Sequence, residues 1–293
     1  DIFALKGKNA LGSDFFVPFQ DQGRNQRDSL ADSEKAYSAI DIVAVEDNTT
    51  IEITPTKPVY RNASNPDWPA GSTYEVTLDR GETYTLPPAY DVSDGTFNRD
   101  GADHIGGTRL HVKDDKKIAV TKKDDSVKHP LEGCYDLIGD QMVPLHIYGK
   151  EYIAMRGELD DPLENVYVTA TENNTRIWFE GKDTTANAPD TIIDAGGQAR
   201  YEFRDGILPN NFLHIIANKK VAVLHVSGFG CEMGGAILPP TDKCTGSTKV
   251  GFTRSTSESF YLNIMVRDGA ENGFTTTVNG NPIPLVNVGD FYP

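Results

Sequence analysis

The chain has 293 residues, of which 38% are hydrophobic, and it contains 27 Gly and 17 Pro. This composition suits many short strands joined by turns, each burying one face, and it argues against a helical protein with one large core. Lys and Arg number 28 against 43 Asp and Glu, and the net charge of −15 makes nucleic acid and bare anionic membrane poor candidate partners.

Strand patterns begin near the N-terminus. Residues 44–53 consist of two apolar or β-branched runs around an acidic turn at Asp47-Asn48. A Gly-led strand follows at 81–86, and residues 110–120 form a second strand-turn-strand pattern with its turn at Asp115-Lys116. Because Asn and Asp tolerate the left-handed backbone of tight turns, both patterns predict β-hairpins.

The same series then recurs. Residues 170–177 repeat 44–51 position by position, with the turn at Asn173-Asn174. A Gly-led strand at 197–203 and a second predicted hairpin at 213–223, turning at Asn218-Lys219, complete this copy. Such self-similarity indicates copies of one supersecondary unit.

A fainter third copy follows, with strands at 260–266 and 275–278 around an acidic and Gly-rich turn. The sequence therefore predicts an all-β protein of repeated antiparallel sheet or sandwich units. We expect a first unit with an N-terminal strand at 1–158, a second at 159–256 and the start of a truncated third at 257–293. The period-two rule predicts these inward side chains: Val43, Val45, Ile51, Ile53, Leu110, Val112, Ile118, Val120, Val166, Val168, Leu213, Ile215, Val221 and Val223.

The loops after each second predicted hairpin carry specific motifs. The first has Gly-Cys-Tyr-Asp-Leu at 133–137, Gln-Met-Val-Pro at 141–144 and Tyr-Gly-Lys-Glu-Tyr at 148–152. The second has a Gly/Cys-rich segment at 228–240, which ends in Ile-Leu-Pro-Pro, and Cys-Thr-Gly-Ser at 244–247. These motifs resemble the amino-terminal domain of IgG Fc-binding proteins, and residues 12–16 resemble that family's opening strand. The resemblance covers nearly the whole chain.

What this resemblance implies is an extracellular or cell-surface location. The second loop is most similar to bacterial members, large surface proteins of Bacteroidota that are often exported by type IX secretion. Fc binding belongs to the animal mucin-associated members, and we do not expect it here. The chain departs from the family pattern in having Tyr148 at a frequent Trp position and no cysteine shortly before Cys134.

The cysteines suggest a disulfide. Cys231 and Cys244 flank a short Gly/Pro-rich loop that a disulfide closes easily, and we predict that bond. Two unpaired buried thiols are the alternative. Cys134 is then left over, with a partner expected outside the chain. No Cys/His spacing suits zinc.

No motif with convincing catalytic spacing occurs in the sequence. The glycines at 228–234 look superficially like a dinucleotide loop, but the third is one residue late and Pro239-Pro240 cannot begin the required helix. His111 and His214 occupy matched repeat positions, which favours a structural role. Acidic clusters in the turns favour a solvated face, with Ca²⁺ as the less favoured alternative. We therefore predict no catalytic, cofactor-binding or metal residues.

The function we expect is that of a non-catalytic adhesion or appendage module in a large secreted cell-surface protein. Its partner would be a surface, a host or prey cell, or a matrix protein or glycan, and homo-oligomeric assembly is a further expectation. Nucleic-acid binding and direct membrane insertion are not expected. The alternative is a glycan-binding or glycan-processing domain that uses aromatic residues such as Trp68, Tyr148 and Trp178.

Overall fold

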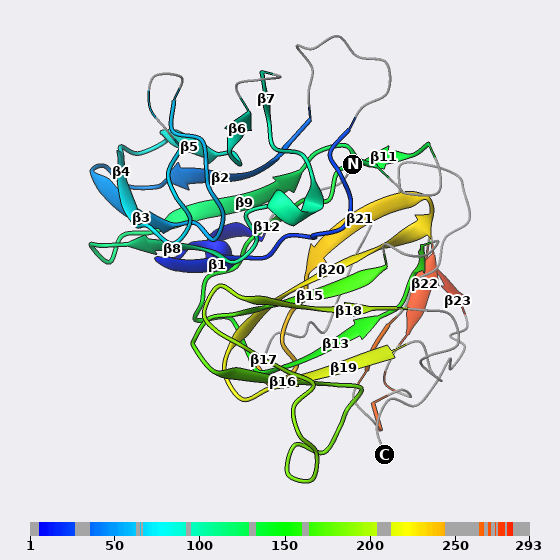
Figure 1. Ribbon diagram of the computed structural model, residues 1–293. Helices are drawn as coiled ribbons and strands as arrows, with labels where there is room; N and C mark the ends of the chain where they lie inside the picture. The colour runs from blue at the N-terminus through cyan, green and yellow to red at the C-terminus, as the bar shows by residue number, and fades with distance from the viewer. Residues whose placement is uncertain are drawn as a thin grey trace.

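The structure is a computed structural model, and the predicted all-β fold is confirmed (Figure 1). The only helical elements in the described ranges are two 3-10 turns, η1 at Gly7–Ala10 and η3 at Gly101–Asp103. The structure describes residues 6–26, 36–62, 65, 67–91, 95–128, 133–159, 164–203, 212–243, 264–266, 269–270, 273, 275–278 and 280–283.

The first unit is a sandwich of two four-stranded antiparallel sheets. Sheet A has the order β12-β9-β2-β5, and sheet B has the order β1-β8-β3-β4. Short two-stranded ribbons, β6-β7 and β10-β11, lie beside them. The strands are β1 (Asp14–Val17), β2 (Ser38–Ala44), β3 (Thr49–Thr54), β4 (Tyr74–Leu78), β5 (Thr83–Leu86), β6 (Tyr90–Asp91), β7 (Thr96–Phe97), β8 (Thr108–Val112), β9 (Ile118–Asp124), β10 (Val127–Lys128), β11 (Tyr135–Asp136) and β12 (Asp140–Gln141).

The second unit repeats this sandwich. Sheet G has the order β13-β19-β16-β17; in sheet H, β15 lies between β18 and β20, β21 pairs with the other edge of β20, and β14 extends the sheet. The strands are β13 (Glu151–Met155), β14 (Glu158–Leu159), β15 (Asn165–Ala170), β16 (Thr175–Phe179), β17 (Thr191–Ile193), β18 (Gln198–Glu202), β19 (Phe212–Ala217), β20 (Val221–Gly230) and β21 (Glu232–Ile237).

The central strand pair has the same register in both units. Ile40 of β2 faces Lys122 of β9 in sheet A, and the corresponding Val166 of β15 faces His225 of β20 in sheet H. β13 pairs with β19, as β1 pairs with β8. By sheet membership the second unit therefore includes β13 and begins before the predicted boundary at 158.

The predicted turns occur where expected, but the strands beside them are not hairpins. β2 belongs to sheet A and β3 to sheet B, and β8 and β9 are divided in the same way. Each turn therefore carries the chain from one sheet of the sandwich to the other. The second unit repeats this arrangement at both of its turns. The hairpin prediction was wrong because two apolar runs around a turn give the same local pattern whether the strands pair within a sheet or face each other across a core.

Acidic residues of neighbouring turns bind the backbone of these turns. Asn48 has a φ of 53° and donates its N–H to Asp79 Oδ1 at 2.8 Å. In the second unit Asn174, with a φ of 56°, donates in the same way to Asp194 Oδ1 at 2.8 Å. The repeated acidic residues at these positions thus satisfy backbone donors and hold two turns of one sandwich together.

The predicted inward positions are buried with two exceptions. Val43 and Val45 are only half-buried, whereas Ile42 and Ala44 point into the core. The prediction was therefore one residue out of register on β2, and a one-residue shift moves every side chain to the opposite face. Alignment with Val166 and Val168 assigns the correct inward positions on β2.

The two sandwiches pack against each other. One continuous core cluster contains inward side chains of the first unit together with the outer face of sheet H, including Tyr167, Leu224 and Val226. Gln198 of β18 accepts a hydrogen bond from Phe19 N at 3.0 Å and donates one to Phe19 O at 3.2 Å. These contacts join the units through packed side chains and paired polar groups.

A disulfide also joins the units. Cys134, in the loop before β11, is bonded to Cys231 at the tip of the β20–β21 hairpin, 97 residues away. This corrects the predicted Cys231–Cys244 pairing and gives Cys134 a partner within the chain; Cys244 itself lies outside the described residues. Spacing favoured the short loop, whereas packing of one sandwich on the other brings the distant pair to a Cα–Cα distance of 5.8 Å.

Hydrogen bonds between carboxylates and backbone N–H groups beside the disulfide reinforce the same junction. Asp136 accepts a hydrogen bond from Met233 N at 2.9 Å, and Asp140 accepts one from Ile237 N at 2.8 Å. Both carboxylates come from the first unit, and both donors belong to β21. The Cys-Asp segment at 134–136 is therefore a junction between the two repeats.

Only part of the predicted third unit is described. β22 (Thr276–Val278) pairs with β23 (Asn281–Ile283) as a two-stranded ribbon. β22 matches the predicted strand at 275–278. The strand predicted at 260–266 lies outside the described residues except for 264–266, which form no strand.

Candidate functional site

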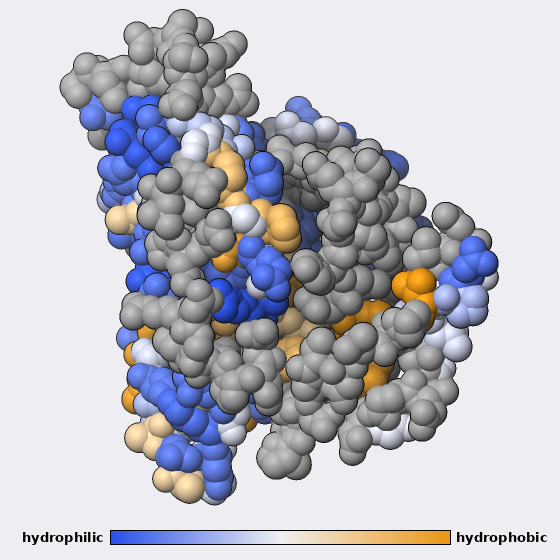
Figure 2. Space-filling view, turned by 90° about the vertical axis from the view of Figure 1, so that its right-hand side faces the viewer, coloured by the Kyte–Doolittle hydropathy of each residue, from blue (hydrophilic) through white to orange (hydrophobic). Residues whose placement is uncertain are grey.

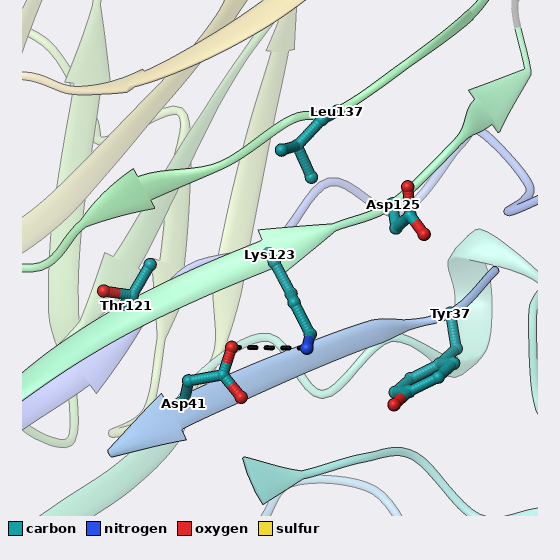
Figure 3. Close-up of a pocket in the computed structure, with 6 residues that line it drawn as sticks. All are labelled: Tyr37, Asp41, Thr121, Lys123, Asp125 and Leu137. Carbon is teal, nitrogen blue, oxygen red and sulfur yellow. Dashed lines mark ion pairs between the residues drawn. The ribbon is translucent and has the colours of Figure 1, made fainter. Parts of the chain in front are cut away.

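A groove crosses the outer face of sheet A, the face turned away from the sandwich core. It has a volume of about 310 Å³ and is lined by Tyr37, Asp41, Thr121, Lys123, Asp125 and Leu137 (Figure 3). All six residues are half-buried. The alternation of β2 and β9 places their odd-numbered residues on this face, because the even-numbered ones fill the core. In size the groove lies at the lower end of the usual range for small-molecule sites.

The groove carries an ion pair. Lys123 Nζ lies 3.3 Å from Asp41 Oδ2, and Figure 3 shows the ammonium between Asp41 and the ring of Tyr37. The same ammonium is 5.6 Å from the centre of the Tyr37 ring, and Thr85 donates a hydrogen bond to Asp41 Oδ1 at 2.6 Å. The ion pair, the ring and the hydroxyl therefore hold the side chains of Asp41 and Lys123 in defined positions.

Aromatic rings extend the groove at the Tyr37 end. Tyr37 packs against Phe97 with ring centroids 4.6 Å apart, and Phe97 in turn contacts Tyr60 at 5.4 Å and Tyr90 at 5.3 Å. All four rings are partly exposed. The groove thus joins a polar floor to an accessible aromatic cluster, a combination typical of recognition surfaces.

The corresponding face of the second unit is apolar at three positions of its central strands. By register, Asp41, Thr121 and Lys123 correspond to three residues of sheet H that the first sandwich covers. These are Tyr167, Leu224 and Val226. The burial patterns agree, since β9 alternates between buried and half-buried residues whereas the first six residues of β20 are all buried. One copy of the unit therefore uses this face to pack on its neighbour, and the other copy keeps it polar and accessible.

The aromatic residues proposed from sequence lie mostly elsewhere. Tyr148 is buried and donates its hydroxyl hydrogen to Phe16 O at 3.0 Å, and Trp178 is buried and donates Nε1–H to Asn187 O at 2.9 Å. Trp68 is partly buried, stacked on Tyr74 with ring centroids 4.5 Å apart. The buried rings of Tyr148 and Trp178 offer no face to an external ligand, whereas Trp68 is half-buried, as are the four rings of the Tyr37 cluster beside the groove.

The matched histidines are arranged as a structural pair. His111 Nδ1 lies 2.8 Å from Asp14 Oδ1, and His214 Nε2 lies 2.9 Å from Glu151 Oε1. In each unit the carboxylate comes from the strand paired beside the histidine, β1 or β13. The repetition of this contact supports the structural role expected from the sequence.

A buried polar cluster lies beneath sheet A. Lys122 is fully buried, its Nζ has no hydrogen-bond partner, and it faces the Phe19 ring at 4.6 Å. Burial lowers the pKa of Lys122 to about 8, although Asp124 and Asp140 act against this shift. For Asp124, burial opposes ionisation, but His104, Lys122 and Asn25 together keep its pKa below the ordinary value. These groups are enclosed in the sandwich and are not presented to an external ligand.

One group of metal-type side chains occurs in the described part of the chain, formed by Cys134, Cys231 and Glu232. Its two sulfurs are bonded to each other, so thiolate coordination requires prior reduction. The turn carboxylates discussed as Ca²⁺ ligands include Asp47, which accepts a hydrogen bond from Arg80 N at 3.0 Å. Its binding to a backbone N–H supports the structural interpretation of that turn.

Exposed apolar side chains are scattered over the described surface. Figure 2 views the molecule from the side on which β21 to β23 lie, and it shows apolar residues in small areas beside hydrophilic ones. The large exposed ones within the described ranges are Ile192, Phe229, Met265 and Ile283. They belong to different elements, and isolated apolar side chains are normal on protein surfaces.

Sequence reasoning missed the groove. A signal was nevertheless present, because the two copies match in their inward residues but differ at the outward positions of their central strands. Comparison of Asp41, Thr121 and Lys123 with their counterparts would have shown polar side chains in place of Tyr167, Leu224 and Val226.

Comparison with known proteins adds the family. Within the described residues, no helix has the length and apolar character needed to span a membrane. Searches of curated proteins and of solved structures found no match. The model of the family described as IgGFc binding protein matches residues 3–293, which confirms the resemblance seen in the loop motifs. The chain therefore belongs to the IgGFc binding protein family.

Proposed function

We propose that this chain is a non-catalytic extracellular module by which a large exported surface protein attaches to a partner. The family, named for binding an extracellular protein, supports a binding role outside the cell. The observation that carries the proposal is the polar groove on the outer face of sheet A. Its counterpart in sheet H packs on the first sandwich, so this face of the repeat is suited to contact, and in the first unit its central strands carry the polar groove instead.

The rigidity of the two sandwiches supports the same role. The shared core, the Gln198 contacts and the Cys134–Cys231 bond make one body of both units. A rigid connection of this kind suits a module under mechanical load, because force from a bound ligand is then distributed over both sandwiches. The groove strands β2 and β9 are central in sheet A and are held on both edges.

Glycan processing is the second candidate, and the presence of two carboxylates in the groove favours it. Asp41, however, already binds Lys123 and Thr85, and this pairing suits an acceptor for ligand hydroxyls better than a proton donor. We therefore favour binding without turnover.

The wider setting is also part of the proposal. The loop motifs support a parent protein of the bacterial, type IX-exported kind, acting at a surface, a neighbouring cell or a matrix. Assembly into a homo-oligomeric appendage is a further possibility of the same module, because repeated units offer repeated contact surfaces.

The test is to delete this segment from the parent protein and measure attachment of the producing cells to abiotic surfaces and to other cells. We expect attachment to fall while the parent protein is still exported. A full-length Lys113→Gln variant is the matched control, because Lys113 forms an exposed ion pair with Glu75 away from the groove. Unchanged attachment after deletion refutes the proposal, as does hydrolysis of a polysaccharide by the purified chain that Asp41→Asn abolishes.

A further inference from the structure

We infer that the groove on sheet A binds a neutral glycan chain, with sugar rings stacked on the Tyr37 cluster and hydroxyls bound by Asp41 and Lys123. This inference rests on the proposed binding function and names the ligand class of that site. It is argued from the aromatic wall, the polar floor, the local charge and the comparison with the second unit.

The aromatic wall suits the apolar face of a sugar ring. The negative face of an aromatic ring attracts the weakly positive C–H groups that a pyranose presents on one side. Tyr37 borders the groove directly, and Phe97, Tyr60 and Tyr90 continue the aromatic surface beyond it. A chain of several sugar units can therefore pass from the groove onto the neighbouring rings.

The polar floor suits sugar hydroxyls. Adjacent hydroxyls donate and accept hydrogen bonds, and Lys123 is a donor while Asp41 is an acceptor. Their charged atoms lie 3.3 Å apart, so one pair of neighbouring hydroxyls can contact both. Thr121 adds a hydroxyl from β9 on the same floor. Because Thr85 and Tyr37 already hold these side chains, binding costs little side-chain ordering.

The charge of the groove favours a neutral ligand. The ammonium of Lys123 is already paired with Asp41, and the whole chain carries a net charge of −15. Sulfated or carboxylated glycans, and phosphate-bearing ligands, would meet a repulsive field at this face. A neutral chain avoids that repulsion and uses the same hydrogen-bonding groups.

A second copy of the unit is a poorer occupant. Docking between units buries Tyr167, Leu224 and Val226, whereas the same positions in sheet A are Asp41, Thr121 and Lys123. Burying the charged pair against an apolar neighbour would remove both ions from water without new partners, which is unfavourable. The face that evolved for unit packing in one copy is therefore unsuited to that use in the other.

The experiment is isothermal titration of the purified chain with cellohexaose, xylohexaose, mannohexaose and chitohexaose, and with a chondroitin sulfate hexasaccharide. We expect at least one neutral hexasaccharide to bind and the sulfated one to bind at least ten-fold more weakly. Tyr37→Ala and Lys123→Gln should each weaken binding about ten-fold or more, whereas Lys113→Gln should leave it unchanged. Thermal unfolding of each variant checks that the fold is retained, and Lys123→Gln keeps most of the side-chain volume if Tyr37→Ala proves unstable.

Three results would overturn the inference: no binding of any neutral hexasaccharide, tighter binding of the sulfated one, or binding that both groove variants leave unchanged. The cell-attachment assay separates this failure from failure of the proposed function. If Lys123→Gln in the parent protein reduces attachment while no hexasaccharide binds, the groove is a binding site and the ligand class is wrong. If deletion of the whole segment leaves attachment intact, the binding function itself is wrong.

Discussion

Removal of the inter-unit disulfide should lower the stability of the whole chain. The bond between Cys134 and Cys231 closes a loop across 97 residues of sequence. In the chain-entropy model, a loop of this size loses denatured-state entropy equivalent to about 4.7 kcal/mol, and strain in the folded state reduces the net gain. We therefore expect Cys134→Ser to lower the free energy of unfolding by about 2–4.7 kcal/mol.

The pairing makes four variants diagnostic. Cys134→Ser, Cys231→Ser and the double variant should be similarly destabilised, because either change breaks the same bond. Cys244→Ser should destabilise the chain far less than these variants, because it leaves the Cys134–Cys231 bond intact. Guanidinium unfolding gives the free energies, and non-reducing peptide mapping identifies the bonded peptides. Because the two sandwiches share one core cluster, the oxidised chain should unfold in a single transition.

The outcome that refutes this reasoning is equally specific. If Cys231→Ser and Cys244→Ser are equally destabilising and Cys134→Ser has no effect, the bond lies within the second loop, as its spacing suggested. A Cys231–Cys244 peptide in the map would support the same conclusion. Loss of about 3 kcal/mol would then be the expected cost, because the closed loop is short.

Three further substitutions test the interior and the junction. Lys122 has a pKa of about 8 in the fold and an ordinary value of 10.5, so the unfolded chain binds more protons between these values and stability should rise from about pH 8 to pH 10.5. Lys122→Met should abolish that rise, measured by urea unfolding across pH, and a rise that persists in the variant would contradict this assignment. Gly107 has a φ of +87°, and a Cβ there would lie 1.8 Å from Gly196 O of the second unit. Gly107→Ala should therefore lower the melting temperature clearly more than Gly71→Ala, because Gly71 has a similar φ but open space around it. Equal effects would contradict a tight junction. Gln198→Ala removes both hydrogen bonds to the backbone of Phe19 in the first sandwich. It should lower the free energy of unfolding by about 1–3 kcal/mol in chemical unfolding. A decrease below about 0.5 kcal/mol would show that these bonds do not hold the units together.

Local chemistry explains which parts of the fold were predictable. Asn48, Asp115 and Asn174 all have positive φ, the conformation that made their turns recognisable. The turn residues do not determine which strand each neighbouring segment pairs with. Pairing depends on which apolar faces meet across the sandwich, and so the predicted hairpins became crossings between sheets.

Longer-range features were beyond single-sequence reasoning for a related reason. The partner of Cys231 is set by how one sandwich packs on the other, and no local spacing reports that packing. The inward register of β2 was ambiguous because Val43 and Ile42 are both apolar and adjacent. Register is set by the partner strands, where Ile42 faces Val120 across sheet A.

The two copies show how one repeat acquires two uses. Inward positions of β2 and β15, and of β9 and β20, remain mostly apolar because each sandwich needs its own core. Outward positions are free of that constraint, and there the copies diverge. In the second unit, burying Tyr167, Leu224 and Val226 contributes roughly 1.5–3 kcal/mol for each large apolar side chain and fixes the two sandwiches together.

The first unit does not have this stabilisation by burial at the corresponding positions. Asp41 and Lys123 cannot contribute such burial energy, and an exposed ion pair between them stabilises the fold by at most about 1 kcal/mol. Polar side chains are usual on the solvent-facing side of an antiparallel sheet, so the proposed ligand contact rests on the groove and on the aromatic rings beside the ion pair. The second sandwich packs against the first through the shared core and supports this sheet.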